Sequence, residues 1–262
     1  MPAVSRRTLT LAVCGAIVVA LLAVAALAPL PMSIVVPGLT ANVLGADKGT
    51  PVITVSGAKT RPTSGQLRLV TVAATAPNAS VHFSDVAKAW FSSDKAAMPR
   101  DSVYPSGNSV AEIQKANEKE MTDSQQDATT AALKHLGLSP SKVKVTLRLA
   151  DVGGPSAGLL FTLGIIDKVD GDGHGGDLTG GRVIAGTGTI DGSGKVGAVG
   201  GVPLKEKAAV RDGATVFIVP RGECSDAKAA LPGGLKLIPV TTLDNTLSAL
   251  SALRAGQKTP TC

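Results

Sequence analysis

A short turn of glycine, proline and serine carries the residue best suited to chemistry, Ser156. The turn, residues 153–158, leads into the apolar run 159–166, which predicts a buried helix with Ser156 at or near its N-cap. Glycines leave room for another backbone near the hydroxyl, and the unpaired N–H groups of a first helical turn favour negative charge. Acyl transfer needs this combination of nucleophile and oxyanion donors. Serine is also favoured as a plain N-cap, so both interpretations remain open.

A serine nucleophile needs a base, and histidine is one source. The chain has three histidines, His82, His135 and His174, and nothing in the sequence directs one of them toward Ser156. Lysine is the other source, but its amine must be neutral to accept a proton. Its pKa of about 10.4 falls far enough only when the amine is buried in a dry, apolar pocket.

Two lysines, Lys205 and Lys207, lie on a predicted helix over residues 202–211 that follows a glycine pair. Residues two apart on a helix face nearly opposite sides, so at most one of them points inward. Lys205 shares its face with small apolar residues such as Val202 and Ala208, which suits a buried amine better. The alternative is that both are solvated residues of an amphipathic helix.

The composition bears on the size of the core and on the class of partner that the protein binds. With 262 residues the chain can bury a sizeable core, and aromatic residues make up only 2% of it. The net charge of +6 is modest, and no basic run interleaves with aromatic residues. We therefore expect no nucleic-acid partner.

The N-terminal segment predicts a membrane anchor. Residues 8–30 are almost wholly apolar, long enough for a helix to cross a bilayer, and Arg6 and Arg7 precede them. This charge asymmetry predicts a cytoplasmic N-terminus (residues 1–7) and an extracytoplasmic remainder. A signal peptide cleaved after the small-x-small residues 26–28 is the alternative, and a twin-arginine signal is only weakly indicated.

Cys14 lies in the apolar segment, whereas Cys224 and Cys262 lie in the part expected outside, where disulfides persist. We expect a Cys224–Cys262 disulfide, with two free thiols as the alternative. No histidine lies near either cysteine, and the aspartate-rich loop 170–177 lacks the closing glutamate of a calcium loop. No metal is therefore expected.

Helices and strands alternate from Val143 onward, which predicts an α/β fold, with α+β as the alternative. Residues 31–49 are expected to form a neck, and residues 50–262 one domain. The predicted strands cover residues 52–55, 67–74, 143–149, 182–190, 215–219 and 235–240. The predicted helices cover residues 84–92, a tract from about 111, 124–136, a helix ending near 169, 202–211 and 243–253, with a loop over 93–108.

Several motifs together resemble the proteolytic domain of the Lon protease family. They are the Ser156 turn (153–158), Thr187-Gly188-Thr189, the glycine pair with its following lysine, and residues 213–220. The amino-acid sequences of residues 151–158, 177–181 and 124–126 more closely resemble those of membrane-anchored, secreted-side bacterial Lon-like proteases. The motifs cover a core of about residues 121–220.

The resemblance implies a Ser–Lys dyad, with Ser156 as nucleophile. The wording Leu-Lys-Glu-Lys points to Lys207 as the base. Spacing from the glycine pair and from the following proline points instead to Lys205, which we favour while keeping Lys207 as the alternative. Thr187 matches a threonine that orients the lysine, and the backbone N–H groups of Ser156 and Ala157 are expected to hold the oxyanion.

The chain also departs from the family. It has no phosphate-binding loop, only five residues separate Gly137 from the next strand where many relatives insert a PDZ domain, and Gly153 stands where many members have an acidic residue. We expect an ATP-independent serine endopeptidase that needs no cofactor and cleaves polypeptides outside the membrane. The family often forms hexameric rings, so a homo-oligomer is expected. The alternative is an inactive Lon-like scaffold or binding protein of the cell envelope.

Overall fold

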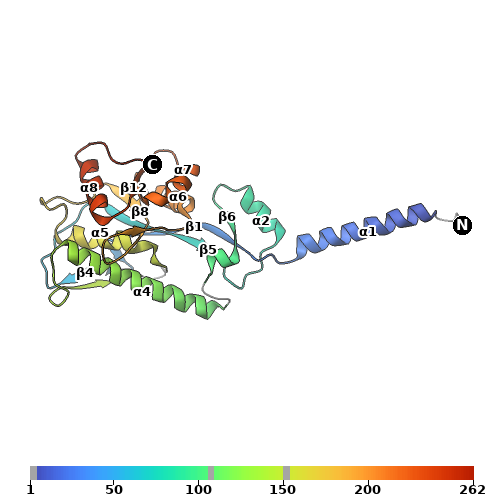
Figure 1. Ribbon diagram of the computed structural model, residues 1–262, viewed down its shortest axis with the longest axis horizontal. Helices are drawn as coiled ribbons and strands as arrows, with labels where there is room; N and C mark the ends of the chain where they lie inside the picture. The colour runs from blue at the N-terminus through green and yellow to red at the C-terminus, as the bar shows by residue number, and fades with distance from the viewer. Residues whose placement is uncertain (1–4, 106–108, 150–153) are drawn as a thin grey trace. The chain divides into compact units, whose positions relative to one another are not determined.

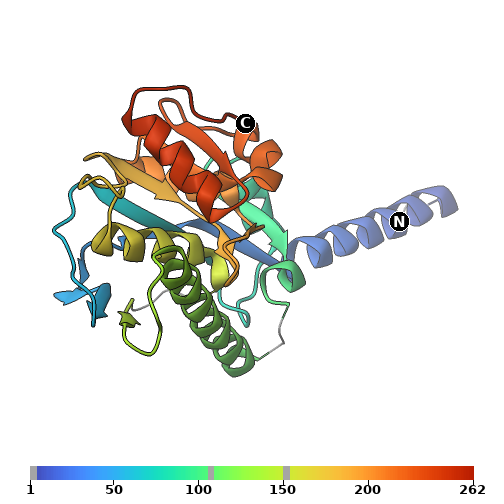
Figure 2. The ribbon, with the colours of Figure 1, turned by 60° about the vertical axis from the view of Figure 1, so that its left-hand side comes forward.

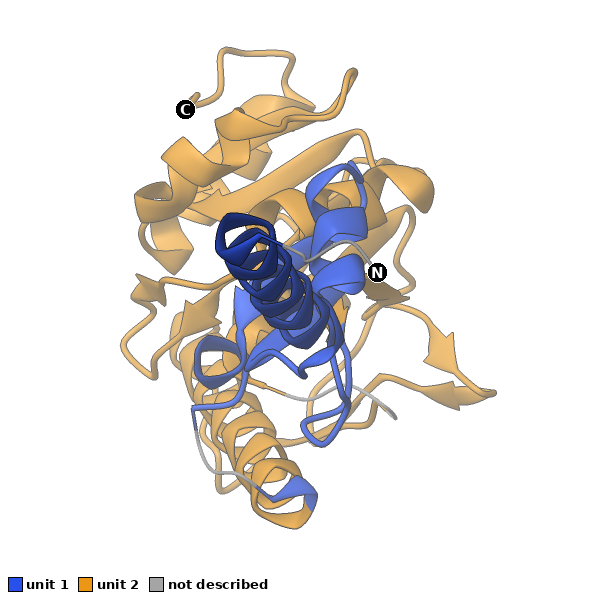
Figure 3. Cartoon of the chain, turned by 90° about the vertical axis from the view of Figure 1, so that its right-hand side faces the viewer, with its two compact units in different colours: residues 1–36, 74–110 blue, residues 37–73, 111–262 orange. Residues whose placement is uncertain are grey.

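The computed structural model of the protein describes residues 5–105, 109–149 and 154–262 (Figure 1). Residues 151–153, part of the family resemblance, lie outside the described residues. The chain divides into two compact units: unit 1 comprises residues 1–36 and 74–110, and unit 2 comprises residues 37–73 and 111–262 (Figure 3).

Unit 1 contains the N-terminal helix α1 (Arg6–Leu27), which has 22 residues and a mean hydropathy of 2.7. By length and composition it is able to cross a membrane. Residues 93–105 are not all loop as expected, because β6 (Ala96–Pro99) and the short helix α3 (Arg100–Val103) form there. Helix α2 (Phe83–Trp90) completes the unit.

The expected neck is largely a strand, β1 (Met32–Asn42). Its first residues pair antiparallel with β6, with Met32 opposite Pro99. Val43 directly follows β1, and its N–H donates to the carbonyl of Leu67 in β5 (Gln66–Ala74). The β-branched and apolar residues of this segment gain backbone partners only from distant parts of the chain, so local sequence does not show the strand.

Unit 2 is built on a sheet in the order β12-β11-β8-β5-β1. The strands β12 (Lys236–Val240), β11 (Val216–Pro220), β8 (Val183–Gly186) and β5 are parallel. The carboxyl ends of parallel strands meet at one edge of a sheet, where α/β proteins place their sites.

Helices cover both faces of this sheet. On β11, Val216 and Ile218 pack with α4, α5 and α8, whereas Phe217 and Val219 pack with α6 and α7. Figure 2 shows α4 and α5 running across one another. The helices of unit 2 are α4 (Val110–His135), α5 (Gly158–Val169), α6 (Val202–Arg211), α7 (Cys224–Ala229) and α8 (Leu243–Arg254). The mixed α/β class expected from the sequence is confirmed.

Helix α4 replaces the two helices that were expected over this stretch. It runs unbroken because residues 110–135 contain neither glycine nor proline. Three small two-stranded sheets complete unit 2: β2 (Ala46–Asp47) with β3 (Thr50–Pro51), β4 (Ile53–Ser56) with β7 (Lys144–Leu147), and β9 (Thr189–Ile190) with β10 (Val196–Gly197). One-turn 3-10 helices occur at Pro155–Ala157 (η1) and Arg221–Glu223 (η2).

Candidate active site

Lys205 and Thr187 form a buried hydrogen bond at the carboxyl edge of the parallel strands. Thr187 follows β8, and its N–H donates to Ile218 O of β11 at 3.0 Å. Lys205, on α6, donates from Nζ to Thr187 Oγ1 at 3.1 Å. The two residues are 3% and 0% exposed. This burial lowers the pKa of Lys205 to about 8, against a smaller opposing effect of Glu223.

The helix that carries Lys205 begins at a glycine for steric reasons. Gly201, the N-cap of α6, has φ +70°. A Cβ at this position would lie 2.9 Å from Val72 Cγ1. A side chain at this position would therefore be strained by the backbone angle and would force Val72 or the start of α6 to shift.

Thr187 connects Lys205 to the Ser156 turn. Its hydroxyl donates to Ser156 O at 3.3 Å, and the neighbouring Gly188 N–H donates to the same oxygen at 2.9 Å. The three residues brought together as candidates by sequence are thus linked in space through one hydroxyl.

Contacts with α4 hold the Ser156 turn in place. Ser124 Oγ donates to Pro155 O at 3.0 Å. Gly158 allows this approach, because a Cβ there would lie 2.9 Å from Ser124 Oγ. Gly154, at φ +82°, occupies a backbone region that side chains disfavour. The serine in the motif Ser-Gln-Gln therefore positions the turn, a role that sequence alone did not assign.

The hydroxyl of Ser156 is not a helix cap. Ser156 lies within η1, and the N-cap of α5 is Ala157, which makes no side-chain capping bond. Within the described residues Ser156 Oγ has no hydrogen-bond partner, and so does not bond directly to Lys205 Nζ. At the end of η1 the Gly158 N–H donates to Pro155 O.

Lys207, the alternative base, differs from Lys205 in its surroundings. It lies two residues farther along α6, about 200° around the axis, and is partly exposed. The bond to Thr187 belongs to Lys205. Of the two lysines, Lys205 is therefore the one whose amine is buried and bonded to Thr187.

Sequence reasoning missed two acidic residues. Glu223 is partly buried in η2, just after β11, where its charge raises the pKa of Lys205 against the effect of burial. Glu206 is 0% exposed, and neither carboxylate oxygen has a hydrogen-bond partner in the described parts of the chain. Burial raises its pKa to about 8. Nothing in the sequence distinguishes Glu206 from the solvated glutamates.

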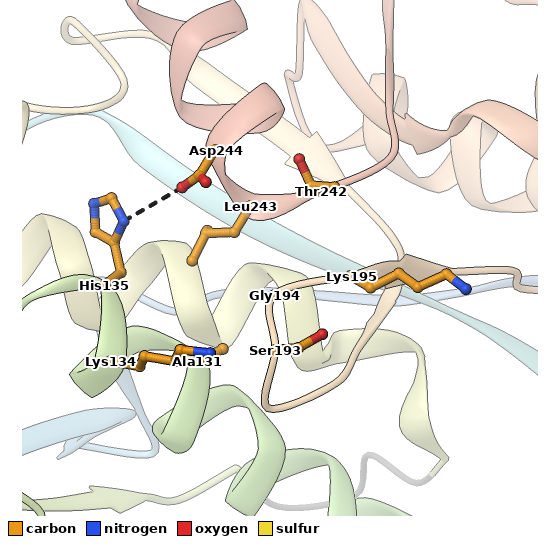
Figure 4. A pocket seen from close by; sticks show the side chains of 9 residues that line it. All are labelled: Ala131, Lys134, His135, Ser193, Gly194, Lys195, Thr242, Leu243 and Asp244. Atoms are coloured by element: carbon orange, nitrogen blue, oxygen red, sulfur yellow. Dashed lines mark ion pairs between the residues drawn. The ribbon is translucent and has the colours of Figure 1, made fainter.

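The histidines lie elsewhere. His82 precedes α2 in unit 1, and His174 lies in the exposed part of the loop 170–177. His135 Nδ1 lies 3.6 Å from Asp244 Oδ1, beside a groove of about 330 Å³ (Figure 4). The lining of that groove includes neither Ser156 nor Lys205.

The aspartates of the loop 170–177 are held by protein donors. Asp172 pairs with Arg254, and Asp177 pairs with Arg61 at 2.8 Å. No group of three or more metal-ligating side chains occurs among the residues described.

Cys224 and Cys262 are joined by a disulfide, and Cys14 is a free thiol. The disulfide attaches the C-terminus to the start of α7. It also adjoins Glu223, the acidic residue whose charge acts on Lys205.

A groove of about 410 Å³, lined by both polar and apolar side chains, lies between α4 and β7. Gln125, Gln126 and Thr129 line it from the helix, and Val145 and Leu147 from the strand. β7 pairs with β4 along one edge, and the chain continues from β7 toward the Ser156 turn. No protein-family model matches the chain.

Proposed function

We propose that this chain is an ATP-independent serine endopeptidase of the Lon-like type, with Ser156 as nucleophile and Lys205 as base. The observation that carries the proposal is the buried amine of Lys205, hydrogen-bonded to a threonine whose hydroxyl contacts the Ser156 turn. A lysine with a pKa of about 8 is neutral in a useful fraction of molecules near neutral pH.

In the first half-reaction Ser156 Oγ attacks the scissile carbonyl while neutral Lys205 accepts the hydroxyl proton. The backbone N–H groups of Ser156 and Ala157 stabilise the oxyanion of the tetrahedral intermediate. The lysine ammonium then protonates the leaving amine, and an acyl-enzyme ester remains. Water, deprotonated by Lys205, hydrolyses this ester and releases the carboxylate product.

Thr187 and Glu223 support the charged lysine in each half-reaction. Thr187 accepts a hydrogen bond from Nζ and so aims the amine. Glu223 favours the ammonium that forms during attack. Its role parallels that of the carboxylate in a Ser-His-Asp triad, which stabilises the base after proton transfer.

The substrate is a polypeptide in an extended conformation. The groove between α4 and β7 does not include Ser156, but β7 forms one of its walls, and main-chain pairing with a strand suits an unfolded segment of any sequence. The apolar helix α1 anchors the chain in the cytoplasmic membrane with unit 2 outside, an orientation supported by Arg6 and Arg7 before the span.

Labelling of the full chain by a serine-directed acylating probe tests the proposal. We expect labelling to rise as the pH increases through about 8, and to be lost in Ser156→Ala and in Lys205→Met. Lys207→Met is the matched control on the same helix and is expected to label like the parent. Equal labelling of the parent and Lys205→Met would exclude Lys205 as the base.

The alternative function is a catalytically inactive envelope scaffold. It is favoured by one observation, the lack of a direct Ser156–Lys205 hydrogen bond within the described residues. A hydrogen bond between a nucleophile and its base often forms only in the substrate complex. The lack of this bond without substrate is therefore compatible with both functions. A parent protein that never labels and never cleaves unfolded protein would support the scaffold.

A further inference from the structure

Helix α2 of unit 1 carries aromatic side chains that are largely exposed in the described part of the chain. Phe83, Trp90 and Phe91 are 60%, 82% and 90% exposed. By contrast Phe161 and Phe217 are both 0% exposed, and Tyr104 donates its hydroxyl proton to Thr75 O. Half of the six aromatic residues of the chain therefore lie exposed on one short helix and its cap.

These residues share one side of α2. Phe83, Ala87, Trp90 and Phe91 follow the spacing i, i+4, i+7, i+8, which places them along a continuous apolar stripe. The opposite side is already used, because Ala89 is 2% exposed. Helix α2 thus has two apolar sides, and only one contributes to the interior of unit 1.

Hydrogen bonds tie the start of α2 to the end of α1. Leu30 N–H donates to Val81 O at 2.7 Å, and Val81 lies two residues before Phe83. A second tie joins the same segments, because Arg100 donates from its backbone to Pro31 O and from Nη2 to Ala79 O. Only residues 28–30 separate α1 from this contact, a span of at most about 10 Å.

This tether places α2 at the membrane surface if α1 spans the bilayer. Twenty-two helical residues are about 33 Å long, close to the roughly 30 Å of the hydrocarbon core. Leu27 then lies at the boundary of the core, and α2 begins within the headgroup layer next to it. Tryptophan and phenylalanine are favoured in that layer because their rings tolerate a mixed environment.

We infer that the stripe formed by Phe83, Ala87, Trp90 and Phe91 docks into the lipid interface where α1 leaves the membrane. Contact is through apolar and aromatic side chains rather than charge, since Lys88 and Lys95 are matched by Asp85 and Asp94. α1 must span the bilayer for this docking, whereas peptidase activity is not required. Docking of the stripe attaches unit 1 to the membrane at a second point, in addition to α1. This second point restricts the rotation of the rest of unit 1 about the axis of α1.

Trp90 is the only tryptophan, so the fluorescence of the unmodified full chain reports this site alone. The protein is reconstituted into uncharged phosphatidylcholine vesicles, with and without bromine on the acyl chains, and flotation first establishes that α1 is inserted. We expect quenching by shallow bromine positions, about 5–10 Å below the interface, and protection from acrylamide in the water. Added salt is expected to change neither result.

Two variants sharpen the result. Phe91→Ser keeps the reporter but removes a neighbouring anchor, and it is expected to reduce bromine quenching. W90F/L231W moves the only tryptophan to position 231, an exposed position of unit 2. Its quenching by acrylamide gives the value expected for a tryptophan that is open to water.

Inserted protein whose Trp90 is open to acrylamide and unaffected by bromine would overturn the lipid contact. Protection that depends on the number of protein copies per vesicle would show instead that a second copy covers the stripe. Protection that appears only on addition of an unfolded polypeptide would assign the stripe to substrate. Failure to float with the vesicles would exclude the membrane span itself, and the lipid contact with it, without bearing on the Ser156–Lys205 dyad.

Discussion

Lys205 Nζ and Thr187 Oγ1 lie 3.1 Å apart in a site closed to solvent, although 18 residues separate them in the chain. The hydroxyl both accepts from the amine and donates to Ser156 O. The amine of Lys205 is thus connected to the backbone of the Ser156 turn through the hydroxyl of Thr187.

Thr187→Val tests the orienting role of the hydroxyl while keeping the shape of the side chain. A hydrogen bond to a charged group contributes about 1.5–3 kcal/mol, so we expect kcat to fall about 10- to 100-fold. The measurement is peptide cleavage at saturating substrate. Thr189→Val, in the same Thr-Gly-Thr motif, is the control and should retain the parent rate. Unchanged kcat in Thr187→Val would remove Thr187 from the site.

Glu223→Gln tests the electrostatic support of Lys205. Because Glu223 raises the pKa of Lys205, its neutralisation should move the rising limb of the pH–rate profile to lower pH. The plateau rate should also fall, by up to about fivefold, since the interaction of Lys205 with a partly exposed charge contributes no more than about 1 kcal/mol. Asp226→Asn on the exposed surface of α7 is the control. A profile that stays in place would limit Glu223 to a structural role.

Glu206→Gln tests the cost of a buried, unpartnered carboxyl group. The folded pKa is about 8, above the usual 4.5, so the folded state binds more protons between these values and stability falls as the pH rises. The parent should therefore lose about 2–3 kcal/mol relative to the variant between pH 5.5 and 7.5. Denaturant unfolding at both pH values measures the difference. Glu118→Gln, exposed on α4, should show no such trend, and a pH-independent difference for Glu206→Gln would contradict the burial argument.

C224S/C262S removes the disulfide without leaving either thiol of the pair. The two residues lie 38 positions apart, and closing a loop of this length stabilises the folded state by about 4 kcal/mol in the chain-entropy account. We expect a loss of 2–4 kcal/mol in the free energy of unfolding. Addition of reductant to the parent should reproduce the loss, and a parent unaffected by reductant would indicate that the bond is dispensable.

Local sequence was sufficient to predict those helices and strands whose start, end and apolar spacing are all encoded within the element itself. The helix over residues 202–211 was predicted with the bounds it has, because a glycine before it and small apolar residues at helical spacing are local signals. The turn into α5 was also predicted from local glycines and an apolar run, and the strand predicted over 215–219 lies within one residue of β11, Val216–Pro220. The strand β1 was missed, since its partners are contributed by residues far away in the chain.

By itself, the sequence determined that Ser156 occupies a glycine-lined turn, that two lysines follow a glycine pair, and that the N-terminal helix is apolar enough for a membrane. The helical face and the spacing favoured Lys205 but left Lys207 open, and the tertiary structure decided which lysine is buried, because the two differ by about 200° around the axis and packing covers only the Lys205 side. It likewise decided that Glu223 acts on Lys205, and that Phe83 and Trp90 face outward rather than into a core. Burial and through-space charge depend on neighbours that the folded chain brings together, and no local pattern encodes them.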